Sequence, residues 1–214
     1  MGEFIVRLSS LTLQNIKNVK KGTIFMPMAN EKLLNVGGAE ILGIYGQNGS
    51  GKTAVVDGLY FLQQIMIGET IDQSISDYIG VDDDAAHMNA EFKIFGKEKI
   101  YEVGYNIELK KIDGDVVIER EFLNCAINQD GKRTNKNIFM DYVRCESESI
   151  FKPQTRLDEL IGKDKERRTD LIVARKMAEK SNCSFIFGES SREIVCQKVE
   201  DKFKNYSNVI KALF

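Results

Sequence analysis

The stretch ILGIYGQNGSGKTAVVDGLYFLQ, residues 41–63, decides the fold class of this sequence. A short apolar run comes first, a glycine-rich loop follows, and the last part has the periodicity of a helix. The middle of the stretch, residues 46–53, fits the pattern GxxxxGK[ST] of a phosphate-binding P-loop. Since a P-loop joins a strand to a helix, the stretch predicts a strand over 41–45 and a helix over 53–66.

The residue types in the loop match the needs of triphosphate binding. Backbone N–H groups at a helix N-terminus can cradle a dense anion, and glycines let the backbone come close because they lack a Cβ atom. A lysine supplies a cation for the β- and γ-phosphates, and a threonine hydroxyl can ligate Mg²⁺. We therefore expect ATP and Mg²⁺ as ligands. The predicted binding residues are Gly46, Gln47, Asn48, Gly49, Ser50, Gly51, Lys52 and Thr53, with Thr53 as the magnesium ligand.

Strand periodicity is found on both sides of this stretch. Residues 4–19 alternate apolar and polar side chains, and residues 22–28 predict a second strand. Farther along, four strands follow one another at hairpin spacing, with Asp113-Gly114 and Asp130-Gly131 as turn signals. These segments predict an antiparallel meander over about residues 90–145.

The period changes to nearly four from about residue 155, which predicts helices over 155–162 and 168–180. An apolar stripe over 191–214 runs to the last residue with no glycine or proline to end a helix, so we expect a fragment that continues into a C-terminal lobe. We divide the chain into a P-loop nucleotide-binding lobe with an antiparallel sheet, residues 1–150, and a helical segment, residues 151–214.

The predicted fold class is α/β, a P-loop NTPase core with an antiparallel β-meander and C-terminal helices. We expect a P-loop core sheet flanked by the helices of residues 155–214. A separate antiparallel sheet would combine the N-terminal strand pair with the meander.

Charge and composition narrow the function classes. The chain has 30 Lys and Arg against 32 Asp and Glu, a formal net charge of −2, so DNA or RNA as a partner has no support from net charge. Two local basic clusters, residues 17–21 and 131–136, are explained as exposed turns. No apolar run approaches the roughly 18 to 20 residues of a membrane span, and we expect a cytoplasmic protein without membrane contact.

The loop and its surroundings resemble the ABC-type ATPase heads of the SMC, RecF and overcoming-lysogenization-defect families. The likeness lies in GxNGSGKT followed by Asp57-Gly58, and in LTLQNIKNVKKGTIFM, which is similar to the opening strand pair of such heads. Ile16 stands where those heads usually have an aromatic residue. The resemblance extends to bacterial AAA-type, ABC-like ATPases of phage-defence or toxin-type loci, and it covers residues 6–127.

Such heads also have an LSGGQ-like signature, a Walker B strand ending in Asp-Glu and a switch histidine, and the sequence matches none of them. Residues 185–189, FIFGE, have Gly188 in the place of the magnesium-coordinating Asp. The acids of YIGVDDD follow a run broken by Gly80, and His87 fits a packing or solvent role better than catalysis. The sequence therefore assigns no catalytic residue.

The resemblance implies the ATP-binding lobe of an ABC/SMC-like ATPase, in which hydrolysis requires a Walker B and signature lobe and head-to-head dimerisation. We expect this chain alone to bind Mg-ATP without turnover, and the full-length protein to hydrolyse ATP as a homodimer. The process could be phage defence or a DNA-related one. Two alternatives stay open: a small P-loop kinase with residues 163–168 as its lid, and a nucleic-acid-binding module with incidental nucleotide binding.

Overall fold

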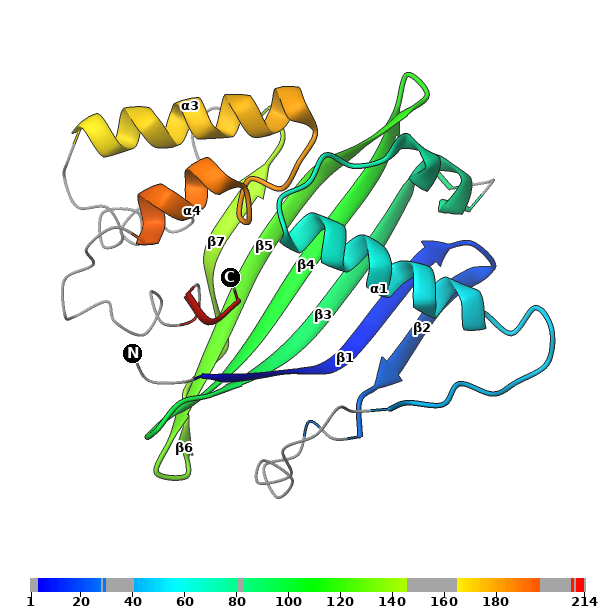
Figure 1. The fold of residues 1–214 in the computed structure, drawn as a ribbon, viewed down its shortest axis with the longest axis horizontal. Helices are drawn as coiled ribbons and strands as arrows, with labels where there is room; N and C mark the ends of the chain where they lie inside the picture. Colours follow the sequence, from blue (N-terminus) through cyan, green and yellow to red (C-terminus); the bar gives the residue numbers. More distant parts are fainter. Residues whose placement is uncertain are drawn as a thin grey trace.

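Seven antiparallel strands form one sheet in the computed structural model, which describes residues 4–27, 29, 41–80, 83–145, 165–196, 209 and 211–213 (Figure 1). The strand order is β2-β1-β3-β4-β5-β6, and β7 also pairs with β5. The strands are β1 (Ile5–Ile16), β2 (Val19–Phe25), β3 (Ala85–Phe95), β4 (Ile100–Ile112), β5 (Asp115–Gln129), β6 (Lys132–Arg133) and β7 (Asn137–Val143).

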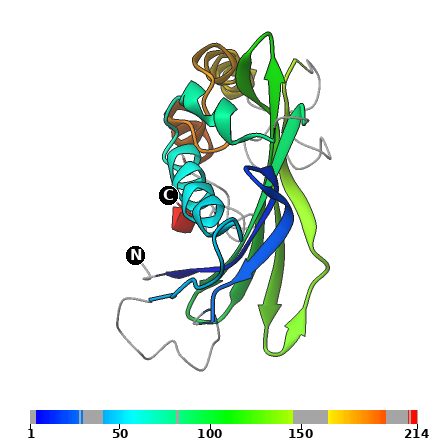
Figure 2. The ribbon, with the colours of Figure 1, turned by 90° about the vertical axis from the view of Figure 1, so that its right-hand side faces the viewer.

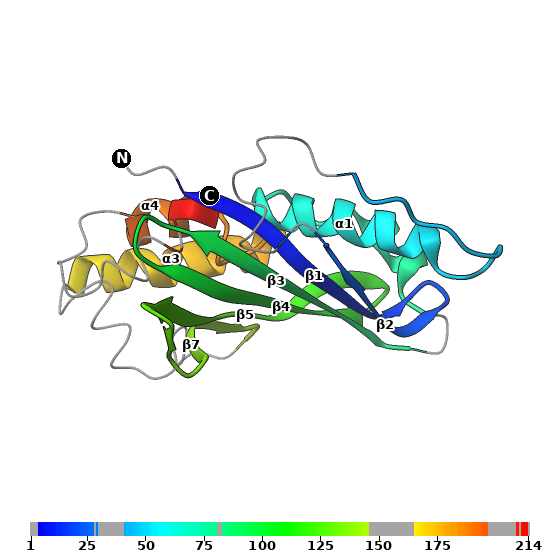
Figure 3. The ribbon, with the colours of Figure 1, turned by 90° about the horizontal axis from the view of Figure 1, so that it is seen from below.

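The described helices all lie on one face of this sheet, which gives two layers (Figures 2 and 3). We call this face the inner face and the opposite one the outer face. None of the described helices has the length and hydropathy that a bilayer span requires. The helices are α1 (Lys52–Met66), the 3-10 helix η2 (Gln73–Tyr78), α3 (Lys165–Ser181) and α4 (Glu189–Cys196).

Strand alternation separates the two faces chemically. In β3, Ala86, Met88 and Ala90 are buried, whereas His87 and Asn89 between them are only half-buried. Successive side chains of a strand point to opposite faces, so the apolar set forms the core under α1 and the polar set forms the outer face. α1 completes the core with one stripe of buried residues, namely Ala54, Gly58, Phe61, Leu62 and Ile65.

Both predicted Asp-Gly turns close their hairpins as expected. Asp113 and Gly114 have φ angles of 52° and 93°, and Asp130 and Gly131 have 52° and 74°. Two successive residues with positive φ are the requirement of a type I′ turn, whose twist matches that of the flanking strands. The meander prediction is thereby confirmed, and so is the predicted α/β fold class with helices in the C-terminal part.

Two finer expectations differ from the structure. The strand expected over 41–45 is wrong, because these residues have no regular secondary structure, and Ile41 and Tyr45 are 93% and 94% exposed. A strand needs a neighbour for its backbone N–H and C=O groups, and no described strand pairs with this run. Likewise, the described residues contain no separate P-loop core sheet. The helix predicted over 155–162 and most of the stripe over 191–214 lie outside the described residues.

A buried carboxylate joins the sheet to the segment before α4. Glu121 of β5 accepts hydrogen bonds from the Tyr105 hydroxyl at 2.5 Å and the Ser184 hydroxyl at 2.7 Å. It also accepts from the backbone N–H groups of Phe185 at 2.5 Å and Ile186 at 3.0 Å. Burial raises the pKa of the Glu121 carboxyl, although these hydrogen bonds act in the opposite direction. Glu121 therefore satisfies donors that would otherwise be buried without a partner.

Replacing Glu121 by glutamine tests this anchor. The amide keeps one acceptor oxygen and turns an NH₂ group toward groups that are donors themselves. Leaving one or two buried donors unpaired costs about 1–3 kcal/mol each, so Glu121→Gln should lower the free energy of unfolding in urea by that order. The matched control is Glu119→Gln on the same strand, whose carboxylate is half-buried and 3.9 Å from the Lys110 ammonium. Equal free energies of unfolding for the two variants would show that Glu121 does not anchor the segment before α4 to the sheet.

Candidate functional site

The P-loop sequence forms a turn that leads directly into α1. Gly49 and Gly51 have φ angles of 82° and 87°, and α1 begins at the next residue, Lys52. Within the turn, the Ser50 N–H donates to the Gln47 carbonyl at 3.2 Å. Only glycine adopts such angles without strain, so the two glycines allow the chain to curl around the start of the helix.

The Lys52 side chain folds back over this turn. Its ammonium donates to the carbonyl oxygens of Gly46 at 2.7 Å and Gln47 at 2.6 Å, and it lies 3.5 Å from the Ser50 hydroxyl. The loop carbonyls thereby hold a solvent-accessible cation next to the N-terminus of α1. An anion bound there would meet this charge and the backbone N–H groups together.

The N-terminus of α1 has the features of an anion site. No side chain caps this 15-residue helix, and its first turn contains no acidic residue. The first N–H groups of a helix have no intrahelical acceptor, and the helix dipole adds roughly half a positive charge there. A pocket of about 600 Å³ opens beside this end, lined by the loop, by the start of α1, by Lys17 and Asn18, and by Asp77, Ile79 and Gly80.

The turn between β1 and β2 holds the loop in place. The Asn18 amide donates to the Gly49 carbonyl, and the Val19 side chain packs against Gly51. Lys17, which has a φ of 52°, pairs its ammonium with the Asp57 carboxylate of α1. The same ammonium lies 4.3 Å from the centre of the Tyr78 ring of η2. The hairpin turn, η2 and α1 therefore meet around the pocket.

All eight residues predicted from the sequence lie in this loop and the first turn of α1, where residues 46–50 and Thr53 are exposed. Their role in binding stays a prediction. Sequence reasoning missed Lys17, Asn18 and Asp77 as residues of the pocket. The sequence shows residues 17–21 only as a basic cluster, because their approach to the loop depends on the hairpin turn.

Two of the weaker candidates, FIFGE and His87, lie away from the pocket, whereas Ile79 and Gly80 of YIGVDDD line it. Residues 185–187 of FIFGE are a buried turn rather than a strand, and Glu189 begins α4. His87 lies on β3 among the polar residues of the outer face, opposite the face that carries α1. Within the described ranges, no three His, Cys, Asp or Glu side chains gather as a metal site would require.

The family described as "AAA domain, putative AbiEii toxin, Type IV TA system" matches residues 41–181. The DNA replication and repair protein RecF of Deinococcus radiodurans is 31% identical to this chain over 111 residues. The aligned part is 51% of this chain and 27% of RecF, so the chain spans little more than a quarter of that relative. The family match contains the whole loop and α1, together with the meander and α3.

The contact between Gly51 and Val19 gives a stability prediction. A Cβ atom on Gly51 would lie 2.7 Å from Cγ2 of Val19, whereas one on Gly114, at a similar φ, would have no neighbour within 4 Å. Gly114→Ala should therefore cost only the left-handed strain, about 1–2 kcal/mol in the free energy of unfolding. Gly51→Ala should cost more, and adding Val19→Ala should recover part of the excess. Equal losses in the two alanine variants would contradict the packing of the loop on the hairpin.

Proposed function

The chain belongs to this family of AAA domains, and we propose on that premise that residues 46–53 bind ATP with Mg²⁺. Families of AAA and ABC-like ATPases bind nucleotides and generally use these two ligands. The observation that carries the proposal is the uncapped N-terminus of α1 with the Lys52 ammonium beside it. We further propose that residues 1–150 act as the nucleotide-binding lobe of an ABC/SMC-like ATPase.

The phosphates would meet two kinds of positive charge. Backbone N–H groups and the dipole act along the axis of α1, and Lys52 supplies a full charge at the loop. Lys17 lines the same pocket and brings a second cation, which Asp57 now holds. A charge-assisted hydrogen bond to phosphate is stronger than a neutral one, so these lysines would dominate the affinity for a triphosphate.

Binding of Mg²⁺ would depend on the bound nucleotide. Thr53 offers an exposed hydroxyl on the first turn of α1, and Asp77 is the acidic residue among those lining the same pocket. Mg²⁺ keeps several waters and is commonly held by one or two protein oxygens plus substrate phosphates. Bound Mg²⁺ would neutralise charge on the β- and γ-phosphates. These residues fit a metal that arrives with ATP rather than one held by the protein alone.

Lys52→Ala should weaken binding of Mg-ATP at least about tenfold, because a hydrogen bond to a charged group contributes about 1.5–3 kcal/mol. The backbone of the loop stays, so some binding should remain. Lys97→Ala, an equal charge change at the exposed hairpin between β3 and β4, is the control and should leave the affinity unchanged. Calorimetric titration of both variants measures this. If Lys52→Ala binds Mg-ATP with unchanged affinity, the nucleotide does not bind at the loop.

Binding phosphates does not by itself accelerate hydrolysis, because groups must also orient the attacking water and stabilise the developing charge. In the heads that this chain resembles, the Walker B acids and the signature motif of a second head supply those groups. We propose that hydrolysis requires such a lobe beyond residues 1–150, and that the complete protein acts as a head-to-head homodimer. A role in phage defence or in a DNA-related process belongs to the same proposal.

A kinase is less well supported by the arrangement of the helices. Residues 165–168 of the suggested lid form the first turn of α3, and residues 163–164 lie outside the described ones. Figure 1 places α3 at the opposite side of the fold from the N-terminus of α1. A lid must reach the phosphates, so α3 does not suit that role.

We predict that the 214-residue chain binds Mg-ATP, releases negligible phosphate and stays monomeric when ATP is added. Phosphate release and the mass measured by light scattering, with and without ATP, test the two parts separately. The control is the Lys52→Ala chain, which should give the same background rate. Robust turnover that this substitution abolishes would mean that the chain contains its own catalytic carboxylate.

A further inference from the structure

Two lysine ammonium groups of the proposed nucleotide site are held by oxygen atoms of the protein itself. The Lys52 ammonium donates to the carbonyls of Gly46 and Gln47, and the Lys17 ammonium pairs with the Asp57 carboxylate of α1. Both lysines line the same pocket of about 600 Å³. A polyphosphate that enters this pocket must compete with these acceptors for each cation. Carbonyl oxygens are neutral, whereas a carboxylate carries a full charge, so the acceptor that holds Lys17 is the stronger competitor.

The backbone of Lys17 is fixed, but its side chain can change partner. The Lys17 N–H group donates to the Tyr78 carbonyl of η2, and the side-chain amide of the next residue, Asn18, donates to the Gly49 carbonyl of the loop. The ammonium, by contrast, lies at the end of a flexible four-carbon chain, and the side chain is 27% exposed. A new partner for the ammonium therefore requires only new side-chain rotamers, while the hairpin turn stays on the loop.

Tyr78 gives the Lys17 ammonium a second contact beside Asp57. The ammonium lies 4.3 Å from the centre of the Tyr78 ring. The ring in turn packs edge-on against Phe61 of α1, with 5.0 Å between the two ring centroids. A cation over an aromatic face gains electrostatic stabilisation in addition to its ion pair. The position of the ammonium at Asp57 is therefore held by two contacts from two elements, α1 and η2.

Asp57 lies behind the end of α1 at which phosphates would bind. It follows Lys52, the first residue of the helix, by five positions, which is about 7.5 Å along the helix axis. Phosphates at the loop would lie beyond the helix end and therefore farther away. Repulsion between exposed charges is largely screened beyond the Debye length, about 8 Å at physiological ionic strength. Asp57 would thus act on the phosphates mainly through Lys17, because direct repulsion is weak at this separation.

We propose that Asp57 lowers the affinity of the loop for polyphosphates, because it competes with them for the Lys17 ammonium. This inference rests on the proposed function, since it assigns a regulating residue to the same site. When a polyphosphate binds at the loop, the ammonium leaves the carboxylate and donates to a phosphate oxygen, while Asn18 keeps its bond to the loop. Binding then exchanges one ion pair for another, so a substitution that removes the carboxylate charge increases the affinity.

Calorimetric titration of the 214-residue chain with Mg-ATP and with magnesium tripolyphosphate tests this exchange. Asp57→Asn keeps the shape of the side chain and removes its charge, so it should tighten binding of both ligands roughly threefold or more. A gain in affinity cannot result from a damaged fold. Lys17→Met keeps an apolar chain and removes the ammonium, so it should weaken binding. Adding Asp57→Asn to Lys17→Met should then give no gain.

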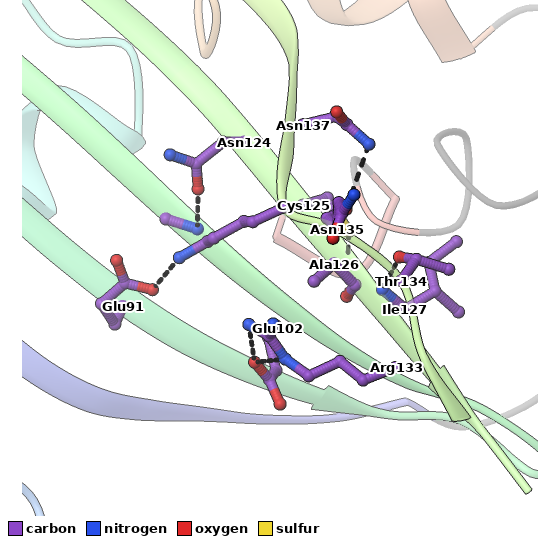
Figure 4. Close-up of polar contacts among 12 residues, drawn as sticks. Glu91, Glu102, Asn124, Cys125, Ala126, Ile127, Arg133, Thr134, Asn135 and Asn137 are labelled. Atoms are coloured by element: carbon purple, nitrogen blue, oxygen red, sulfur yellow. Dashed lines mark hydrogen bonds and ion pairs between the residues drawn. The ribbon is translucent and has the colours of Figure 1, made fainter. Parts of the chain in front are cut away.

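The ion pair between Lys136 and Glu91 on the outer face offers a matched control (Figure 4). Its side chains are 27% and 32% exposed, and those of Lys17 and Asp57 are 27% and 22% exposed. Glu91→Gln removes the same charge from the same kind of pair, on the face of the sheet opposite α1. It should therefore leave the affinity for both ligands unchanged.

Unchanged or weaker binding in Asp57→Asn would overturn the exchange. An equal gain in the Lys17→Met background would overturn it too, because Asp57 would then repel the phosphates directly. The same holds for an equal gain in Glu91→Gln, which would make net charge the cause. The proposed function itself fails if the unsubstituted chain does not bind Mg-ATP, or if Lys52→Ala binds it equally well. The titrations of the unsubstituted chain and of Lys52→Ala therefore distinguish the two failures.

Discussion

Gly58 of α1 packs directly on Leu13 of β1, and this contact sets how closely the helix approaches the sheet. A Cβ atom on residue 58 would lie 2.8 Å and 2.9 Å from the two methyl groups of Leu13, so a larger residue would either displace the Leu13 side chain within the packed core or push the helix outward. The loop at the N-terminus of α1 would move with it. The contacts of the hairpin turn with Gly49, Gly51 and Asp57 all require the present distance.

The two faces of the sheet differ in the side chains that they carry. The apolar inner face positions α1 and, through Glu121, the turn before α4, so that the proposed nucleotide site rests on a rigid core. The outer face carries polar side chains at the alternate positions of the same strands, such as His87 and Asn89 of β3. Strand alternation separates the two faces, because successive side chains of a strand point to opposite sides of the sheet.

Local patterns in the sequence predict what depends on neighbouring residues. The Asp113-Gly114 turn, the meander and the loop before α1 all follow from short-range chemistry, and the structure contains them. The strand over 41–45 fails because an apolar run does not reveal whether a partner strand exists. The place of Lys17 in the pocket depends on the hairpin that carries it. The burial of Glu121 could be predicted from the strand period, because Glu121 lies two residues before the apolar Leu123 and so on the same face of β5.

Amide hydrogen exchange, measured with and without Mg-ATP, tests the central claim that the loop and the hairpin turn form one nucleotide site. The account predicts slower exchange over residues 46–55 and over the turn at residues 17–19, because the turn holds the loop through Asn18 and Val19. The central strands should exchange at unchanged rates. Unchanged exchange over residues 46–55, with protection appearing elsewhere in the chain, would contradict the account.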